Sequence, residues 1–184
     1  MCVAEFGCGT MRYEVRIAGL GGQGIVLLGV VLAKAIASND KLHVVQTQSY
    51  GPESRGGAVR ADLVISDEPV DYPKVRKADV LVVMSQAAFD AYLGDLKESG
   101  TLVFDPGLVT PETRRSMTLK EVNATKKASQ VGKVLLANMI MLGALLNIIN
   151  LASKEAVINA LRDSVPEKNL GEDVRAMEAG LEVR

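Results

Sequence analysis

Histidine and cysteine are scarce in this chain, and their scarcity removes most kinds of metal site. The 184 residues include one histidine, His43, and two cysteines, Cys2 and Cys8. One histidine disfavours a histidine-based metal site. The spacing of the cysteines matches no common zinc or iron–sulfur pattern, and an iron–sulfur cluster normally takes four cysteines. We therefore expect no metal ion and no cluster in this chain.

An excess of charge of either sign is also missing. Charged residues make up 23% of the chain and the formal net charge is -1, so there is no basic field to attract nucleic acid and no acidic tail. The lack of cysteine after Cys8 suits a reducing compartment, and residues 1–12 have neither the basic start nor the apolar segment of a secretory signal. We expect a cytoplasmic protein that does not bind nucleic acid.

The length is sufficient for one well-buried domain and short for two. Residues 1–10 precede Met11 and then a strand-like segment. We therefore predict a disordered N-terminal extension over residues 1–12, or an alternative start, and a single domain over residues 13–184.

The clearest pattern runs from Val15 to Lys34. A β-branched start gives way to Gly19, Gly21, Gly22 and Gly24, and then to an apolar run without charge before Lys34. This predicts a strand, a tight turn and a buried helix from Gly22 to about Ser38. The glycines fit the G-x-G-x-x-G spacing, which leaves free N–H groups at a helix N-terminus for an anion. A turn that only packs helix on strand gives the same pattern, so other residues must decide between the two.

The rest of the chain alternates between strand-like and helix-like segments. We predict a short helix over Ala87–Leu96 with Gly100 as its stop, and strands over Leu42–Gln48, Ala58–Ser66, Asp79–Ser85 and Thr101–Phe104. The nine-residue loop 49–57 is too short for a helical crossover, so the two strands that it joins should be antiparallel, with Ala58–Ser66 partly exposed. The fold class is therefore α/β, a Rossmann-like open mixed sheet with helices on both faces.

Val131–Asn150 is a long apolar segment with Lys133 as its only charge, after a polar stretch from Pro111 to Lys127. A membrane span is the alternative at this length, but the uncharged part begins only at Val134 and contains asparagines. We predict a helix buried in the core or against a partner, in which Asn138 hydrogen-bonds to backbone or to that partner. Two short amphipathic helices should follow, capped by Ser153 and by Asn169, the latter with Glu172 in a capping box.

Catalytic residues are not evident. An NAD enzyme needs an acidic residue at the end of the second strand, where Thr47, Gln48 and Ser49 stand, and Asp40 precedes that strand. The chain has no P-loop lysine and no nucleophile-elbow sequence. We predict no catalytic residue, and expect the isolated chain to bind neither NAD nor thiamine diphosphate and to have no activity alone.

Three segments together resemble a known family. They are Gly-Leu-Gly-Gly-Gln-Gly at Gly19–Gly24, Tyr-Gly-Pro-Glu-Ser-Arg-Gly-Gly at Tyr50–Gly57, and Asn-Met-Ile-Met-Leu-Gly-Ala at Asn138–Ala144. They resemble the gamma subunit of the 2-oxoacid:ferredoxin oxidoreductases that use pyruvate, 2-oxoglutarate or ketoisovalerate. The resemblance covers about residues 13–184.

The resemblance implies a multisubunit enzyme that oxidatively decarboxylates a 2-oxoacid, retains the acyl group on coenzyme A and passes electrons to ferredoxin. It implies alpha and beta partner subunits with thiamine diphosphate and Mg, a ferredoxin-like subunit with iron–sulfur clusters, and no membrane. The gamma subunit would help to form the coenzyme A and substrate side of the site. The sequence leaves the 2-oxoacid open; a chain without a fused ferredoxin domain favours 2-oxoglutarate or a branched-chain acid. The alternative function is a free-standing Rossmann-type nucleotide-binding domain.

Under this resemblance, the candidate coenzyme A or partner contacts are in the glycine turn and the following loop: Gly21, Gly22, Gln23, Gly24, Tyr50, Glu53, Arg55 and Gly56. Arg55 is the foremost candidate because a guanidinium fork suits a phosphate or carboxylate. It could equally pair with Glu53 or with a partner subunit. Gln23 could hydrogen-bond a ligand or the backbone of a partner.

Overall fold

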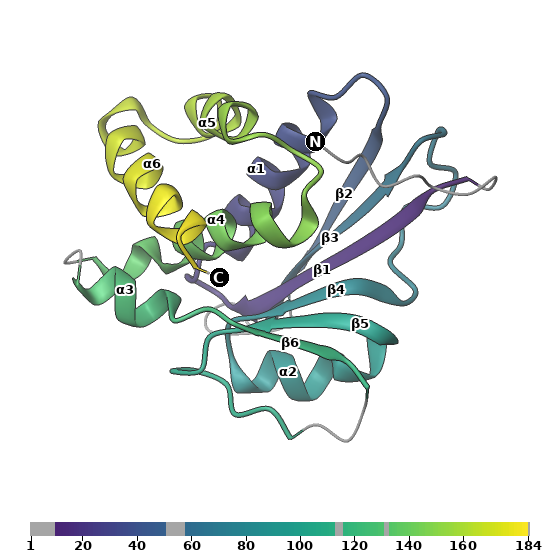
Figure 1. The fold of residues 1–184 in the computed structure, drawn as a ribbon, viewed down its shortest axis with the longest axis horizontal. Helices are drawn as coiled ribbons and strands as arrows, with labels where there is room; N and C mark the ends of the chain where they lie inside the picture. Colours follow the sequence, from purple (N-terminus) through teal and green to yellow (C-terminus); the bar gives the residue numbers. More distant parts are fainter. Residues whose placement is uncertain (1–9, 51–57, 113–115, 131–132, 184) are drawn as a thin grey trace.

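A six-stranded mixed sheet lies at the centre of the computed structural model, which describes residues 10–50, 58–112, 116–130 and 133–183 (Figure 1). The strand order is β2-β3-β1-β4-β5-β6. β1, β4, β5 and β6 run parallel, whereas β3 is antiparallel to both of its neighbours, β1 and β2. The strands are β1 (Arg12–Leu20), β2 (His43–Tyr50), β3 (Ala58–Ser66), β4 (Ala78–Val83), β5 (Leu96–Phe104) and β6 (Thr118–Glu121).

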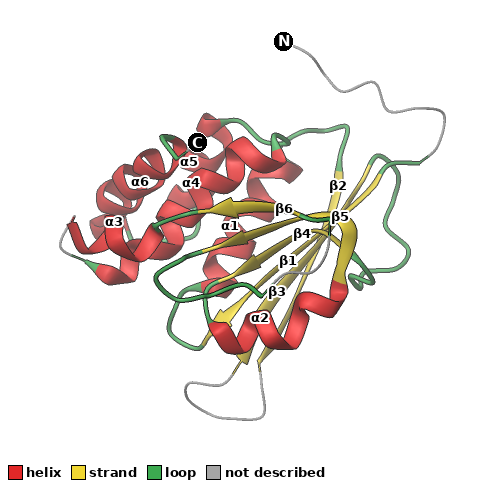
Figure 2. Ribbon diagram, turned by 60° about the horizontal axis from the view of Figure 1, so that its bottom comes forward, coloured by secondary structure: helices red, strands yellow, loops and turns green. Residues whose placement is uncertain are grey.

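Helices cover both faces of this sheet, as predicted (Figure 2). On one face lies α2 (Gln86–Tyr92), which the 3-10 turn η1 (Leu93–Asp95) continues. The other face carries α1 (Ile25–Ala37), α3 (Ala124–Gln130), α4 (Ala137–Ile149), α5 (Lys154–Arg162) and α6 (Glu167–Leu181). The buried side chains accordingly form two clusters, a large one under the five helices and a smaller one under α2.

The antiparallel pair predicted around the loop 49–57 is confirmed, because β2 and β3 pair from His43↔Ser66 to Tyr50↔Val59. The predicted exposure of Ala58–Ser66 was wrong, since seven of its nine residues are buried. β3 is inserted between β2 and β1, so both of its edges and most of both faces are covered. The exposed strand of the pair is β2, at the edge of the sheet.

Gly100 does not stop a helix, which corrects the prediction for Ala87–Leu96. The helix ends at Tyr92, η1 follows, and β5 begins at Leu96 with Gly100 inside it. The polar stretch Pro111–Lys127 contains two elements that the sequence pattern did not reveal, β6 and the start of α3. All four residues of β6 are exposed, so this edge strand lacks the apolar alternation by which strands are predicted.

The apolar segment predicted as one helix over Val131–Asn150 is divided. A 3-10 turn, η2, covers Val134–Leu136, and α4 begins at Ala137. α4 is buried along almost its whole length, as predicted, whereas the side chains of Val134 and Leu135 are 57% and 80% exposed. Within the described residues, no helix is long and apolar enough to cross a membrane.

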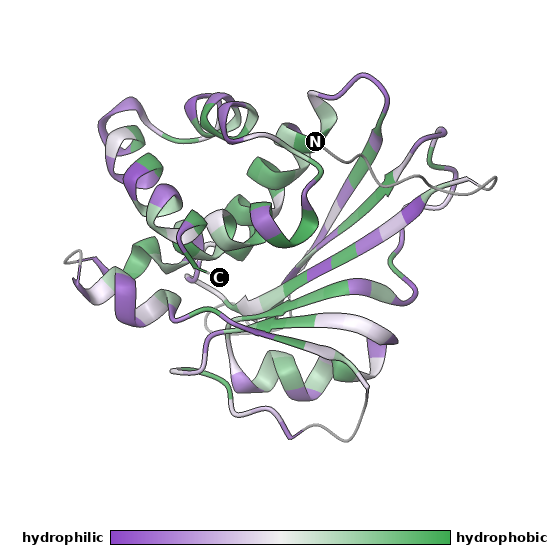
Figure 3. Ribbon diagram, viewed as in Figure 1, coloured by the Kyte–Doolittle hydropathy of each residue, from purple (hydrophilic) through white to green (hydrophobic). Residues whose placement is uncertain are grey.

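The C-terminal helices are amphipathic, with polar outer and apolar inner sides (Figure 3). Ser153 caps α5 as predicted, since its hydroxyl accepts a hydrogen bond of 3.1 Å from the Ala156 N–H. The cap predicted at Asn169 was wrong, because α6 begins two residues earlier, at Glu167 after Pro166. At the other end of the chain, β1 begins at Arg12, so this residue belongs to the sheet and not to an extension; residues 1–9 lie outside the described residues.

Candidate functional site

The carboxyl ends of β1 and β4 form the point at which the helices change sides of the sheet. The two strands are parallel neighbours, and the Met84 N–H donates to the Ala18 carbonyl over 2.9 Å where they end. α1 follows β1 on one face and α2 follows β4 on the other (Figure 2). Open α/β sheets place their ligands outside the strand ends at such a switch point.

The glycine turn leaves β1 at this point. Gln23 N–H donates to the Leu20 carbonyl over 3.2 Å, and Gly22 and Gly24 have φ angles of 94° and 71°, which other residues adopt only with strain. The Gln23 side chain is engaged within the chain: its Oε1 accepts from Leu20 N–H at 2.6 Å and its Nε2 donates to the Met84 carbonyl at 2.7 Å. Gln23 thus ties the turn to the end of β4.

Close packing explains two of the glycines. A Cβ on Gly19 would lie 2.5 Å from Gln23 Oε1, and a Cβ on Gly24 would lie 2.2 Å from Asn138 Nδ2. Asn138 is buried at the start of α4, and its Nδ2 donates to the Gly24 carbonyl over 3.4 Å. The backbone partner predicted for Asn138 is confirmed. Packing and turn geometry therefore account for Gly19 and Gly24 without a ligand.

Gly22 and the start of α1 are different, because they are open. A Cβ built on Gly22 would have no atom within 4 Å. α1 has no side-chain cap and no acidic residue in its first turn, so its N–H groups and the positive end of its dipole are available to an anion. Apolar Val134 and Leu135 lie beside this end and line a cavity of about 140 Å³ together with Gly22, Gln23, Met84, Leu108, Thr125 and Ala137.

This cavity is smaller than the roughly 300–1,000 Å³ of an ordinary small-molecule site. On its own, the cavity is too small to enclose a ligand of that kind. The apolar side chain of Leu135, 80% exposed beside the cavity, is the functional candidate that the sequence pattern did not reveal. The sequence shows Val134 and Leu135 as two adjacent apolar residues. Because we predicted one continuous buried helix here, we did not predict that they would be exposed.

Tyr50 is the last residue of β2 and lies at the same end of the strands as the glycine turn. Tyr50 and Gly19 both pair with Val59, from opposite sides of β3. The described residues on either side of 51–57, Tyr50 and Ala58, therefore lie beside the strand that leads into the turn, and the Tyr50 side chain is 63% exposed. Glu53, Arg55 and Gly56 lie outside the described residues, so their roles stay predictions, and no finding tests a ligand contact at Gly21, Gly22, Gln23, Gly24 or Tyr50.

The strand order also bears on the missing acidic residue. In dinucleotide-binding folds, an acid at the end of the second strand reaches the ribose beside the glycine turn. Here β3 lies between β1 and β2, so Thr47, Gln48 and Ser49 are one strand further away. Both the residue types and the topology disfavour NAD at this turn.

A buried ionic cluster on the α2 face was not predicted. Arg16 on β1 donates to both carboxylate oxygens of Asp62 on β3, at 2.7 and 2.8 Å, and also to Asp95 at the end of η1. Its guanidinium lies 5.3 Å from the centre of the Tyr92 ring. Burial alone would lower the pKa of Arg16, but the hydrogen bonds and charge of Asp62, with Asp95, raise it. The cluster fastens the end of α2 to the sheet.

Comparison with known protein families assigns this chain to one of them. Residues 14–183 match the model of the family described as pyruvate ferredoxin/flavodoxin oxidoreductase. The chain belongs to this family. The 2-oxoglutarate synthase subunit KorC of Methanocaldococcus jannaschii is 46% identical over 176 residues, which cover 94% of each chain. KorC of Methanothermobacter marburgensis is also 46% identical, over 94% of this chain and 97% of that protein.

Solved structures agree with this assignment. The keto/oxoacid ferredoxin oxidoreductase gamma subunit of Geobacter sulfurreducens PCA superimposes with a TM-score of 0.83 at 38% identity, over 94% of this chain and 96% of that one. A 2-oxoglutarate:ferredoxin oxidoreductase of Magnetococcus marinus gives a TM-score of 0.84 at 24% identity, over 94% of this chain and 31% of that one, and shows the shared fold.

These matches confirm the resemblance that the three sequence segments indicated. The chain is a gamma-type subunit of a multisubunit 2-oxoacid:ferredoxin oxidoreductase, which favours this function over a free-standing nucleotide-binding domain. Among the residues that the structure describes, no group of three or more His, Cys, Asp and Glu side chains could hold a metal ion. A cluster or a metal ion therefore has no fitting donors in this part of the chain.

Proposed function

We propose that this chain serves an enzyme that oxidises 2-oxoglutarate with coenzyme A to succinyl-CoA and CO₂, and that passes the two electrons to ferredoxin. The observation that carries the proposal is the contrast in identity among relatives. Identity with 2-oxoglutarate synthase subunits KorC is 46% over 94% of this chain in Methanocaldococcus jannaschii and Methanothermobacter marburgensis, and 38% over 92% of it in Archaeoglobus fulgidus. It is 34% with a ketoisovalerate oxidoreductase subunit VorA and 31% with a pyruvate synthase subunit PorC, both from Methanothermobacter marburgensis.

The proposal assigns the remaining chemistry to other subunits. Thiamine diphosphate and Mg would be bound by alpha and beta subunits, and iron–sulfur clusters by a ferredoxin-like subunit, with ferredoxin as acceptor in the cytoplasm. When bound there, thiamine diphosphate supplies the carbanion chemistry of decarboxylation. Among the described residues, no group of three or more His, Cys, Asp and Glu side chains could hold a metal ion, which supports an accessory role.

The accessory role that we propose is to bound the coenzyme A side of the site with the glycine turn and the loop 50–57. The open approach to Gly22 and the uncapped start of α1 support an anion there, such as a coenzyme A phosphate. The small cavity and the exposed Leu135 support a site that a partner subunit completes. Gln23 then acts as a positioning residue, because its amide holds the turn against β4.

Purification of the complex from cells that express a tagged form of this chain tests the proposal. We expect a brown, thiamine-containing assembly that reduces ferredoxin when both coenzyme A and 2-oxoglutarate are present. The value of kcat/KM for 2-oxoglutarate should exceed those for pyruvate and 3-methyl-2-oxobutanoate by about tenfold or more, since the active site selects among acids by contacts worth a few kcal/mol. A preference for either competitor would overturn the substrate assignment.

The chain without its partners provides the matched control. We expect no turnover and, by titration calorimetry, no binding of thiamine diphosphate or NAD. Micromolar binding of NAD by the isolated chain would instead support the free-standing nucleotide-binding domain.

A further inference from the structure

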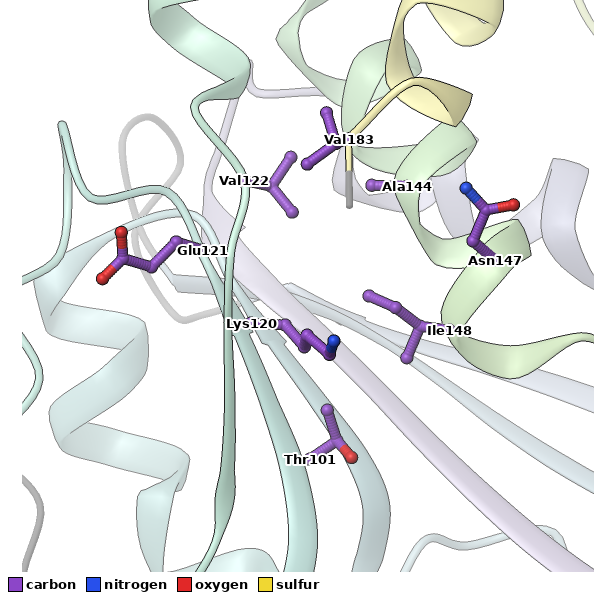
Figure 4. A pocket seen from close by; sticks show the side chains of 8 residues that line it. All are labelled: Thr101, Lys120, Glu121, Val122, Ala144, Asn147, Ile148 and Val183. Atoms are coloured by element: carbon purple, nitrogen blue, oxygen red, sulfur yellow. The ribbon is translucent and has the colours of Figure 1, made fainter.

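A second cavity, of about 440 Å³, lies under the opposite edge of the sheet from β2, between β5, β6 and the C-terminal half of α4 (Figure 4). Eight residues line it: Thr101, Lys120, Glu121, Val122, Ala144, Asn147, Ile148 and Val183. Its volume is within the range of roughly 300–1,000 Å³ that small-molecule sites occupy. None of these residues belongs to the glycine turn or to the loop after β2.

The sheet side of the cavity brings two polar groups together. Lys120 pairs with Val103 in the β5–β6 register, and Thr101 stands two residues before Val103 on the same face of β5. The Lys120 side chain extends across the cavity toward α4, and the Thr101 side chain lies next to it with its methyl group on the Lys120 side (Figure 4). Within the described part of the chain, the Lys120 ammonium has no ion-pair or hydrogen-bond partner.

The remaining walls are largely apolar. Ile148 lies near the end of the Lys120 side chain, Val122, Ala144 and Val183 line another part of the cavity, and the Glu121 carboxylate points away from it (Figure 4). The C-terminal segment is held over the cavity by Asn147, whose Nδ2 donates to the Leu181 carbonyl over 2.8 Å, and by the Val183 N–H, which donates to the Gly180 carbonyl over 3.1 Å.

The charges and walls define the chemistry of a ligand. Lys120 is the only cation among the described lining residues, and the Glu121 carboxylate faces elsewhere, so these residues offer a ligand a single positive charge. The second negative charge of a phosphate dianion would have no cationic partner among the described lining residues. An apolar tail, by contrast, would remove the aliphatic side chains from water. We propose that this cavity binds a small monocarboxylate with a hydrocarbon tail, its head on Lys120 and its tail against Val122 and Ile148.

The proposed site is separate from the glycine turn but shares a helix with it. Asn138 at the start of α4 contacts Gly24, whereas Asn147 near its end lines the cavity. Nine residues of helix separate the two by roughly 14 Å, at about 1.5 Å per residue. The proposal does not depend on the substrate of the enzyme, so its failure would leave the proposed function intact.

The test is a titration of the full-length, 15N-labelled chain with hexanoate, followed by backbone amide chemical shifts. We expect saturable shifts at Lys120, Thr101, Asn147 and Val183. Hexan-1-ol, which lacks the charge, and acetate, which lacks the tail, should each bind more weakly by about tenfold or more, because each loses one of the two contributions. Equal affinity for hexanoate and hexan-1-ol, or shifts confined to other residues, would overturn the proposal.

Two variants of cavity residues and one control variant test the same binding site. Lys120→Met keeps the length of the side chain without its charge, and should weaken hexanoate binding about tenfold while hexan-1-ol binding is unchanged. Lys41→Met, at an exposed lysine in the turn before β2, is the matched control and should not change either affinity. Ile148→Trp should fill the cavity and abolish binding of both probes. If either cavity variant fails to fold, the comparison of probes on the unaltered chain still decides.

The assembled complex distinguishes a ligand site from a subunit contact. Lysine acetylation followed by mass spectrometry should modify Lys120 in the complex, and saturating hexanoate should protect it. Protection of Lys120 by the partner subunits in the absence of hexanoate would identify an interface there and overturn the proposal.

Discussion

The side-chain amide of Asn138 occupies the space that a Cβ on Gly24 would need, because a Cβ at that position would lie 2.2 Å from Asn138 Nδ2. The start of α4 and the glycine turn therefore fit each other only when residue 24 is glycine and residue 138 is a compact polar side chain. Because α4 is buried along its length, this contact connects the core directly to the turn at the switch point.

Asn138→Leu should lower the free energy of unfolding by about 1–3 kcal/mol, because the Gly24 carbonyl loses its side-chain donor in a buried setting. Urea denaturation measures the effect. Asn159→Leu, at an exposed position of α5, is the control and should change stability by no more than about 0.5 kcal/mol. The same small change at both positions would show that the Asn138 hydrogen bond contributes nothing.

Gly143→Ala should destabilise the chain because a Cβ on Gly143 would lie 1.9 Å from the Met177 carbonyl oxygen of α6. Overpacking of this kind typically costs about 1–3 kcal/mol or more. Gly171→Ala is the matched control in α6, where the nearest atom to the new Cβ is 3.6 Å away. Helix propensity should make this control more stable by about 0.5–1 kcal/mol. Thermal unfolding of the two variants should thus give shifts of opposite sign.

Arg16→Met should lower the free energy of unfolding by up to about 3–5 kcal/mol, because the buried Asp62 carboxylate loses both of its Arg16 hydrogen bonds and keeps only the Arg60 guanidinium, 3.6 Å away. The double variant Arg16→Met/Asp62→Leu should recover much of that loss, since it also removes the buried carboxylate that has lost its two hydrogen bonds. Chemical denaturation of the two variants and the wild type gives the comparison. Lys154→Met, which removes an exposed pair with Glu178, should have little effect. A double variant no more stable than Arg16→Met would contradict the role of the buried charge.

Asp173→Asn should make the chain more stable at neutral pH. Burial, and then the nearby charge of Glu172, raise the pKa of Asp173 above 3.8 in the folded chain. The folded state therefore holds this proton more tightly, and the free energy of unfolding falls as pH rises from about 3.8 through the raised pKa. The advantage of the asparagine variant should shrink below that window. Denaturation at several pH values checks this, with the exposed Asp40→Asn as control.

Arg55→Ala in the assembled enzyme should raise the KM for coenzyme A by about tenfold or more and change the KM for the 2-oxoacid much less. The reason is the loss of a charge-assisted contact of about 1.5–3 kcal/mol. Arg55→Lys should restore only part of the affinity, because it keeps the charge without the fork. Failure of the complex to assemble around a folded variant would make Arg55 an interface residue. Unchanged assembly and kinetics would exclude both roles.

Much of the fold could be predicted because its signals are local. The strand, glycine turn and helix from Val15 onward, the antiparallel pair around loop 49–57 and the N-cap at Ser153 all depend on residues close in sequence. The same is true of the buried character of α4, which follows from its nearly uninterrupted apolar composition. The family resemblance rested on three short segments and was sufficient to indicate the enzyme.

The elements that were missed depend on partners far away in the sequence. β6 has no apolar face of its own and becomes a strand only because β5 offers it an edge. Leu96 to Gly100 joins β5 for the same reason, although Gly100 reads as a helix stop. Val134 and Leu135 are apolar yet exposed, because the chain needs a tight turn before α4 reaches the core.

The sequence by itself determined the class of the fold and the family, since these follow from composition, local pattern and motif. Only the tertiary structure decided what the polar residues do. It assigned Gln23 to the end of β4, Asn138 to the glycine turn and Arg16 to Asp62. It also left Lys120 facing a cavity. The physical reason is that a hydrogen bond or ion pair depends on distance in space, which strand order and helix packing set.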